Sequence, residues 1–593
     1  MNTPRSSSLR HRLRALCVPA LTLVALAAFA GNAGAHVSAA QAEHSADRGV
    51  AWFLSNQEES GSFGFGGDWA MTALAADGLN AADAKTSPLD PSAQDFYLGE
   101  WQASGPGGAG TDAARGILSA IAGGIQPSRL SISDDATRSN LVARLAELFD
   151  GTQIGEPGLL NDDIFGLLAL HQAGAPPELL RLIADYLRTK QLPGGGWTWN
   201  ASPGAPADTD MTGSAVAALC AAGVGPGDPD LDRALELLHT LQDPVTGGFV
   251  APPESFGIGV NTDTTAWVTS GLVQCGIDPQ APEWTTAGGK TPLDYLVSQQ
   301  RPDGHFDWTD EFSGGAFETY SSVRPLSGEA FSAPPPARLD GVSPAVRPAA
   351  PVLAGTTVPI ALVIDHGPGV GDVRMCRIDA ETGSSLAEVL GEAEAASTPA
   401  GCVTEFEAAA SGGGERLVSL NGVAASSDYE WRVGVGGQSP QSAASEPIGF
   451  GDLVFLDFEA KTANPSRPVA VEVPPLRAAK HPRRRGPRIS LRGPDRRDGD
   501  RVALRLYCPR GNGGGGCRGV LTFQFRDGGG LLGGGSAPFA VPSGDGRSIG
   551  VPTSEALREA LSRRAKVKLR VTAATRAEDG SVRLTHGKRT LVG

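Results

Sequence analysis

Apolar positions between residues 40 and 325 follow a helical period, and one kind of segment recurs along this stretch. It ends in a Gln that is followed by a Gly-rich turn and one aromatic residue, as in Gln191 to Trp197 (QLPGGGW) and Gln300 to Phe306 (QRPDGHF). Four residues before each such Gln stands Phe or Leu, one helical turn away on the same face. The pattern predicts an amphipathic helix that ends at each Gln.

A second kind of segment alternates with the first. It has a polar or acidic start, a run of small apolar residues and a closing Gly, which are N-cap and C-cap patterns. Such segments begin at Asp68, Thr111, Asn161, Asp208, Asn261 and Phe317. The repeat spacing is roughly fifty residues, and stacked helical hairpins must bury a continuous face. Because Ala and Gly allow close packing of an inner ring, we predict an all-α α6/α6 toroid over residues 40–332, with the second helix of each pair inside.

The period changes to two after a Pro-rich linker at residues 333–352. Alternating segments beginning at Val358, Glu415, Tyr429 and Gly451 predict strands, and Ser384 opens one helix. Residues 353–460 are therefore predicted to form a small α+β, β-grasp-like domain. A basic, Pro-rich linker follows at 461–497, and residues 498–593 alternate again as a small, mostly-β domain. The chain is expected to be multidomain, since one core rarely grows past ~300 residues.

The net charge of −15 is unevenly spread over the 593 residues. Between Arg477 and Arg501 stand ten basic residues against three Asp. Such a run is typical of a solvated linker, and the alternative is that it binds an anionic cell-envelope polymer. Nucleic acid is not an expected partner.

The first 35 residues have the pattern of a secretory signal peptide. Four Arg precede an apolar run from Ala15 to Ala30, and Ala33 to Ala35 offers small residues for cleavage. No later segment is long enough to cross a bilayer. We expect a secreted or cell-envelope-associated protein.

Export changes the interpretation of the cysteines, of which six follow the signal segment. An even number in an oxidising compartment favours disulfides. The pairs Cys508–Cys517 and Cys376–Cys402 are predicted. Cys220 and Cys275 stand at equivalent points of two successive repeats, where buried free thiols and a bridge are both open.

The Gln–Gly-Gly–aromatic turn followed by Asp/Asn-Thr-Asp-x-Thr resembles the repeat of prenyltransferase β subunits, squalene and hopene cyclases, and cobalamin carriers. For a terpene cyclase, the resemblance implies a DxDD motif whose middle carboxyl donates a proton. The nearest match, Asp208-Thr209-Asp210-Met211, lacks the last Asp, so Asp208 and Asp210 are catalytic candidates only under that hypothesis. Asp beside Cys, HExxH and paired CxxC are missing from the sequence, and we predict no metal site.

The segment from Gly383 to Asp452 resembles the C-terminal domain of the transcobalamin and intrinsic factor family. Its matching features are a Leu386/Leu390 helix, Asn421-Gly422, Trp431 and Gly451-Asp452. In that family the ligand is held between the toroid rim and the β domain. The resemblance implies ligand-facing residues at the inner-helix starts, namely Asp162, Trp197, Trp199, Asp210, Asp263 and Trp267. Cobalamin is the implied ligand; a coordinating His could only be His305 or His366, and neither stands in a recognisable motif.

Three hypotheses follow. The first is an extracytoplasmic binding protein that holds a small ligand, cobalamin-like or apolar, between the toroid rim and the β domain. The second is a terpene- or squalene-cyclase-like enzyme, and the third is a structural or adhesive surface protein. The incomplete catalytic set favours the first, in which the protein is not an enzyme.

Overall fold

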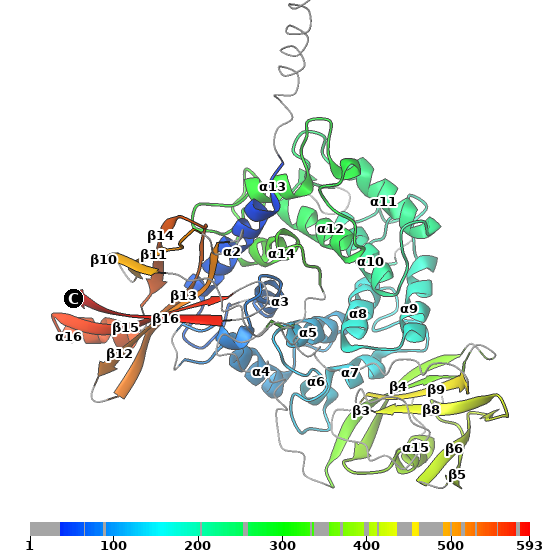
Figure 1. The fold of residues 1–593 in the computed structure, drawn as a ribbon. Helices are drawn as coiled ribbons and strands as arrows, with labels where there is room; N and C mark the ends of the chain where they lie inside the picture. The colour runs from blue at the N-terminus through cyan, green and yellow to red at the C-terminus, as the bar shows by residue number, and fades with distance from the viewer. Residues whose placement is uncertain are drawn as a thin grey trace, which may run out of the picture.

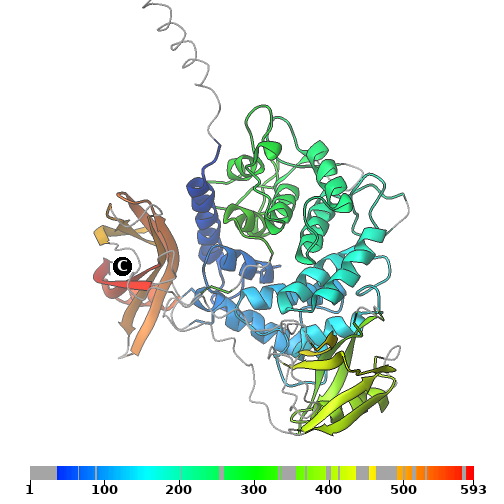
Figure 2. The same ribbon diagram turned by 45° about the vertical axis from the view of Figure 1, so that its right-hand side comes forward.

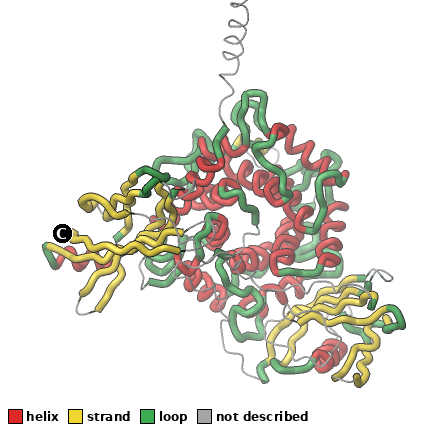
Figure 3. Tube along the Cα trace, in the orientation of Figure 1, coloured by secondary structure: helices red, strands yellow, loops and turns green. Residues whose placement is uncertain are grey.

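The fold was analysed in a computed structural model of the 593-residue chain. It describes residues 36–64, 66–86, 90–201, 204–252, 259–331, 335–336, 355–367, 370, 372–395, 402–411, 414–435, 453–461, 490–498, 501–510, 516–527, 530–553, 555–576 and 582–592. The predicted signal peptide lies outside these residues, as does most of the basic stretch 477–501. The chain has a helical N-terminal part and small sheets in its C-terminal part (Figure 3).

Two layers of helices form the N-terminal part. The inner layer, in the described residues, consists of α3 (Asp68–Ala76), α5 (Gly110–Ala122), α8 (Leu160–Ala173), α10 (Thr209–Ala221), α12 (Thr262–Gln274) and α14 (Ala316–Leu326). These helices contact one another in a cyclic order that closes from α14 back to α3 (Figure 1). Each begins within one residue of the start that the sequence predicts.

The outer layer follows the same order around the ring. Its helices are α2 (Ala39–Asn56), α4 (Ala93–Ser104), α7 (Leu141–Leu148), α9 (Pro177–Thr189), α11 (Pro229–Leu241) and α13 (Pro292–Ser298), with the short α6 (Ala136–Ser139) before α7. From α4 on, each of these six long helices packs on the inner helix that precedes it in the chain, and α2 packs on α14, the last inner helix. The inner helices are buried on almost every side, whereas the outer ones are amphipathic and have a solvent face.

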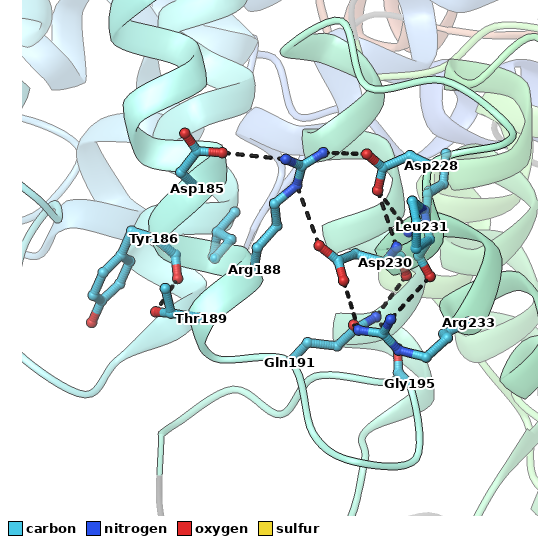
Figure 4. A network of polar contacts seen from close by, with 12 residues as sticks. Asp185, Tyr186, Arg188, Thr189, Gln191, Gly195, Asp228, Asp230, Leu231 and Arg233 are labelled. Atoms are coloured by element: carbon cyan, nitrogen blue, oxygen red, sulfur yellow. Dashed lines mark hydrogen bonds and ion pairs between the residues drawn. The ribbon is translucent and has the colours of Figure 1, made fainter. Parts of the chain in front are cut away.

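The recurring Gln joins each hairpin to the next. Gln191 Nε2 donates to the carbonyl of Gly195 in its own turn and to the carbonyl of Asp230 at the start of α11, both at 2.7 Å. Gly195 has φ +96°, and a Cβ there would overlap the carbonyl of Arg233. Figure 4 shows this junction, which Arg188 of α9 extends by an ion pair to Asp228 at 2.5 Å. The Gln and the Gly of the repeat are therefore packing residues.

Ring closure uses the same contact. Gln300 Nε2 donates to the carbonyls of Gly304 at 2.9 Å and of Ser45 in α2 at 2.8 Å, while Ser45 Oγ donates to Gln300 Oε1 at 2.7 Å. The last repeat is thereby bonded to the first helix, 255 residues away. The closing bond therefore uses the same Gln side chain that joins the other repeats, with a carbonyl in the middle of α2 as its acceptor.

Helices α10 and α12 approach especially closely. A Cβ on Gly213 would lie 2.7 Å from Cα of Val268, so only glycine fits. At their C-terminal ends, Cys220 and Cys275 form a disulfide with Cα atoms 5.2 Å apart. The sequence left this pairing open because both residues occur on apolar helices. The predicted bonds Cys376–Cys402 and Cys508–Cys517 are also formed.

The chain after α14 crosses the C-terminal end of the inner ring. Phe331 is buried and stacks on Trp267 with ring centroids 5.2 Å apart. Pro336 accepts a hydrogen bond of 2.6 Å from Asn80 Nδ2, just beyond the end of α3. The described residues after α14 therefore cover part of this end of the ring.

Residues 355–461 form a mixed sheet of order β4-β3-β9-β8 with a helix and a small second sheet. The elements are β3 (Thr357–Asp365), β4 (Val373–Glu381), α15 (Leu386–Ala395), β5 (Phe406–Ser411), β6 (Gly414–Leu420), β7 (Val423–Ala424), β8 (Tyr429–Val435) and β9 (Leu453–Ala460). The central β3 and β9 are parallel, and all other pairs are antiparallel. Strands β3 and β4 pack against α6, α7 and α9, on the outside of the ring (Figure 2).

The C-terminal residues form two antiparallel sheets, β10-β11-β14 and β13-β12-β15-β16. The elements are β10 (Ser490–Asp498), β11 (Arg501–Tyr507), β12 (Cys517–Asp527), β13 (Gly530–Val541), β14 (Gly546–Pro552), α16 (Glu555–Arg563), β15 (Lys566–Arg576) and β16 (Val582–Val592). This unit contacts α2, where Arg518 forms an ion pair of 2.5 Å with Glu43. It lies on another side of the ring from residues 355–461 (Figure 1).

Candidate ligand cavity

A cavity of about 550 Å³ lies where the inner helices begin. Every inner helix contributes to it, and most of the contributing residues stand in the first turn. Its aromatic lining consists of Trp69, Phe165, Trp267, Trp308 and Phe317. Its polar and small lining consists of Thr111, Arg115, Asp208, Asp210, Met211, Ala251, Asn261, Asp263, Thr264 and Glu318. The size lies within the range of small-molecule sites, ~300–1,000 Å³.

The aromatic wall is a contiguous cluster. Trp69 and Trp267 meet edge to face with centroids 5.8 Å apart, and Phe165 lies 5.7 Å from Trp267 in the same arrangement. Beneath them, the fully buried Arg324 of α14 places its guanidinium 5.4 Å from the Trp69 ring and 5.1 Å from the Trp267 ring. Burial among these rings lowers the pKa of Arg324 to about 10.

Carboxyl groups recur at the same place because each inner helix has an acidic residue in its first turn. A carboxylate there is favoured by the helix dipole and by free backbone N–H groups. Asp208 is the N-cap of α10 and accepts from Met211 N at 3.0 Å. Asp210 and Asp263 each stand at the second helical position of neighbouring helices, α10 and α12.

Burial dominates the electrostatics of these acids. Desolvation raises the pKa of Asp210 to about 7, with a further contribution from the charge of Asp208, while a hydrogen bond with Thr264 opposes the shift. Desolvation also raises the pKa of Asp263 well above its usual range, and the charges of Glu318 and Asp210 add to it. The pKa of Asp208 is raised by burial as well. Part of this group is therefore protonated near neutral pH.

The structure brings three of the six predicted ligand-facing residues to the cavity, namely Asp210, Asp263 and Trp267. Both catalytic candidates of the cyclase hypothesis, Asp208 and Asp210, also line it.

The other three predicted residues do not line this cavity. Asp162 accepts from Thr111 N at 2.7 Å and thereby joins α8 to α5. Trp197 is fully buried and its Nε1 donates to the Leu187 carbonyl at 2.8 Å. Trp199 is 42% exposed and does not belong to the cavity lining.

The two histidines considered as cobalt ligands lie away from this cavity. His366 is buried, with Nε2 3.1 Å from Asn421 Nδ2 and Nδ1 2.8 Å from the Asp372 carbonyl. His305 lies in the last Gly-rich turn, with Nδ1 2.7 Å from Asp303 Oδ1 and Nε2 3.5 Å from Asp307 Oδ1. Among the described residues, no group of three or more His, Cys, Asp or Glu side chains is arranged to hold a metal ion.

Sequence reasoning missed most of the aromatic wall. Trp69, Phe165 and Phe317 stand in or near the first turns of segments that the sequence did identify as inner helices. Comparing the six helix starts with each other would have found them. Trp308 comes from the loop before α14, and its carbonyl accepts from Thr262 N at 2.8 Å. That hydrogen bond joins two repeats, so no local sequence pattern predicts it.

The position of residues 355–461 differs from the arrangement that the carrier resemblance implies. None of the described residues of this unit lines the cavity, because its strands pack on the outer helices α6, α7 and α9. No helix among the described residues is long and apolar enough to cross a membrane.

No protein-family model and no curated protein sequence matches the chain. Among solved structures, it is similar to the type II terpene cyclase MstE from Scytonema. The complex of an MstE variant with geranylgeranyl dihydroxybenzoate has 18% sequence identity and a TM-score of 0.34, covering 49% of this chain and 97% of that one. The apo enzyme has 18% identity and a TM-score of 0.33, covering 48% and 98%. Likeness at this level carries no information about ligand or chemistry.

Proposed function

We propose that the helical ring is an α6/α6 toroid that binds a small, largely apolar ligand in the cavity at its inner-helix starts. The observation that carries this proposal is the aromatic wall of Trp69, Phe165 and Trp267, which lines a cavity of about 550 Å³. Apolar walls with a few convergent polar groups are typical of small-molecule sites. The described disulfides fit export, since such bonds persist in oxidising compartments.

Filling the cavity tests the proposal. Met211 lines the cavity from the first turn of α10, and Met211→Trp would occupy part of its volume. A neutral fluorescent probe, N-phenyl-1-naphthylamine, should gain fluorescence with the wild-type protein and lose most of that gain with Met211→Trp. Val245→Trp is the matched control, because Val245 is 75% exposed in a turn. Equal probe binding by both variants would show that the probe does not enter this cavity.

A second candidate function is acid-initiated cyclisation of a polyprenyl substrate, as in the cyclase hypothesis. The observation that favours it is the raised pKa of Asp210, about 7, which leaves a protonated carboxyl beside aromatic rings. Geranylgeraniol incubated with the protein should then give a cyclic isomer, and Asp210→Asn should abolish it. Recovery of only the linear alcohol from the wild-type protein would reject this candidate.

Cobalamin held by the ring and residues 355–461 is a separate prediction of the carrier resemblance. Titration with cyanocobalamin, followed by native mass spectrometry, tests it directly. Envelope attachment through residues 477–501 is a further prediction, tested by co-sedimentation with anionic cell-wall polymer.

A further inference from the structure

The cavity has an excess of acidic groups. Asp208, Asp210, Asp263 and Glu318 line it, and Arg115 is its one lining cation among the described residues. Arg115 is already engaged elsewhere, since its Nε donates to Asp68 at 2.9 Å and its Nη2 lies 3.4 Å from Asp112. The lining therefore holds more carboxyl groups than its one cation can pair, and the buried Arg324 beneath the rings acts on Asp263 alone among the lining acids with a raised pKa.

Two of these acids each have one carboxyl oxygen without a hydrogen-bond donor. Oδ1 of Asp210 and Oδ1 of Asp263 are buried from solvent, and neither has a partner among the described residues. A buried acceptor without a donor costs ~1–3 kcal/mol, so such atoms are rare unless a ligand supplies the donor. Both residues line the same cavity from adjacent helices, at equivalent positions of two repeats.

The neighbouring rings are suited to a cation. Trp69 and Trp267 already stabilise one, because the Arg324 guanidinium lies over both at 5.4 and 5.1 Å. The face of an indole ring attracts positive charge, and the attraction is strongest where water is excluded. Carboxyl oxygens and indole faces together would hold a nitrogen cation more tightly than a neutral polar group.

We propose that the ligand is a protonated amine with an apolar body, whose N–H groups donate to Oδ1 of Asp210 and Asp263. The apolar body contacts Trp69, Trp267 and Phe165. This inference rests on the proposed ligand cavity and specifies its ligand class. The orphaned acceptors favour a primary or secondary ammonium over a quaternary one, because only the former carries N–H donors.

Calorimetric titration with three matched eight-carbon probes tests the charge requirement. The cation n-octylamine should bind at least about tenfold more tightly than neutral 1-octanol, and octanoate should bind most weakly. Asp263→Asn should weaken octylamine at least about tenfold and change octanol less than about twofold. Asp185→Asn on α9, an exposed carboxylate in an ion pair with Arg188, is the control that should change neither.

The results separate the two proposals. Octanol or octanoate binding as tightly as octylamine would overturn the amine class and leave the apolar cavity standing. If none of the three probes binds, both proposals fail. An effect of Asp185→Asn equal to that of Asp263→Asn would also overturn the inference, because it would indicate nonspecific attraction to an acidic protein.

A measurement on the wild-type protein covers the case in which the variants do not fold. A bound ammonium favours the charged form of Asp210, whose pKa is about 7 in the free cavity, so binding near pH 6 should release protons. Groups that share this environment are Asp208 on α10, Asp263 on α12, and Glu318, Tyr320 and Arg324 on α14. Titrations in buffers of different ionisation enthalpy measure the release, and no release would contradict the contact.

Discussion

The disulfide between Cys220 and Cys275 permits a quantitative prediction about the ring. It joins the C-terminal ends of α10 and α12 and closes a loop with a sequence separation of 55. The loss of chain entropy in the unfolded state for a loop of that length corresponds to about 4 kcal/mol at room temperature. We expect the double variant Cys220→Ser/Cys275→Ser to lower the free energy of unfolding of the ring by about that amount.

Urea denaturation followed by far-UV circular dichroism is the assay, since most helices of the described chain belong to the ring. The control is Cys508→Ser/Cys517→Ser, whose sequence separation of 9 corresponds to about 3 kcal/mol and acts on the C-terminal sheets instead. Because the cross-link lies at the end of the ring opposite the cavity, probe binding should stay unchanged. The wild-type protein is also denatured without reduction and treated with Ellman's reagent. Reaction of two thiols, at Cys220 and Cys275, would refute the disulfide and the stabilisation expected from it.

Four further predictions concern the ring and its cavity. Gln300→Leu removes all three hydrogen bonds of the Gln300 amide, two of them with Ser45, and should lower the free energy of unfolding by about 2–3 kcal/mol in urea titrations. Gly195→Ala should lower the free energy of unfolding by at least about 2 kcal/mol in the same assay, because φ at this residue is +96° and a Cβ there would overlap the next outer helix. Trp197→Phe should destabilise the ring by about 1 kcal/mol through loss of its Nε1 hydrogen bond, yet leave probe binding intact; lost binding at full stability would return Trp197 to the ligand site. The folded ring keeps the Asp210 proton up to about pH 7, whereas the unfolded chain loses it near 3.8, so the free energy of unfolding should fall as pH rises between these values. Asp210→Asn should reduce that slope, to which the raised pKa of Asp263 also contributes, and stabilise the ring near pH 8 by about 2–4 kcal/mol; an unchanged slope in the variant would contradict the buried state of this carboxyl.

The sequence by itself determined the local elements and much of their order. The alternation of Gln-terminated and Gly-terminated segments was sufficient to place the inner helices within one residue, because capping and hydrophobic period are local properties. The same held for β3 and β8, which begin within one residue of the predicted starts at Val358 and Tyr429. Strand β13 was missed, since its run of glycines from Gly533 to Gly535 has neither apolar alternation nor β propensity.

The candidate site could be predicted only in part. Asp210, Asp263 and Trp267 follow from their place at inner-helix starts. In the sequence, Trp197 follows the repeat pattern in the same way as a residue expected to face the ligand. Its ring nevertheless lies between α9 and α10, because its Nε1 donates to the Leu187 carbonyl and its backbone N–H donates to the Thr212 hydroxyl. A turn residue can lie on either side of a helix pair. Packing between repeats decides the side, and no local pattern in a single sequence indicates it.

Tertiary structure decided three further things. It joined Cys220 to Cys275, because close approach at Gly213 brings the ends of α10 and α12 together. It placed residues 355–461 against the outer helices, where β3 and β4 bury apolar side chains on α7, and so left the cavity to the ring alone. It also gathered first-turn acids from separate repeats in one desolvated space, which raises their pKa values. The sequence shows each acid at a helix start, and the packing of the successive inner helices α10, α12 and α14 makes them neighbours.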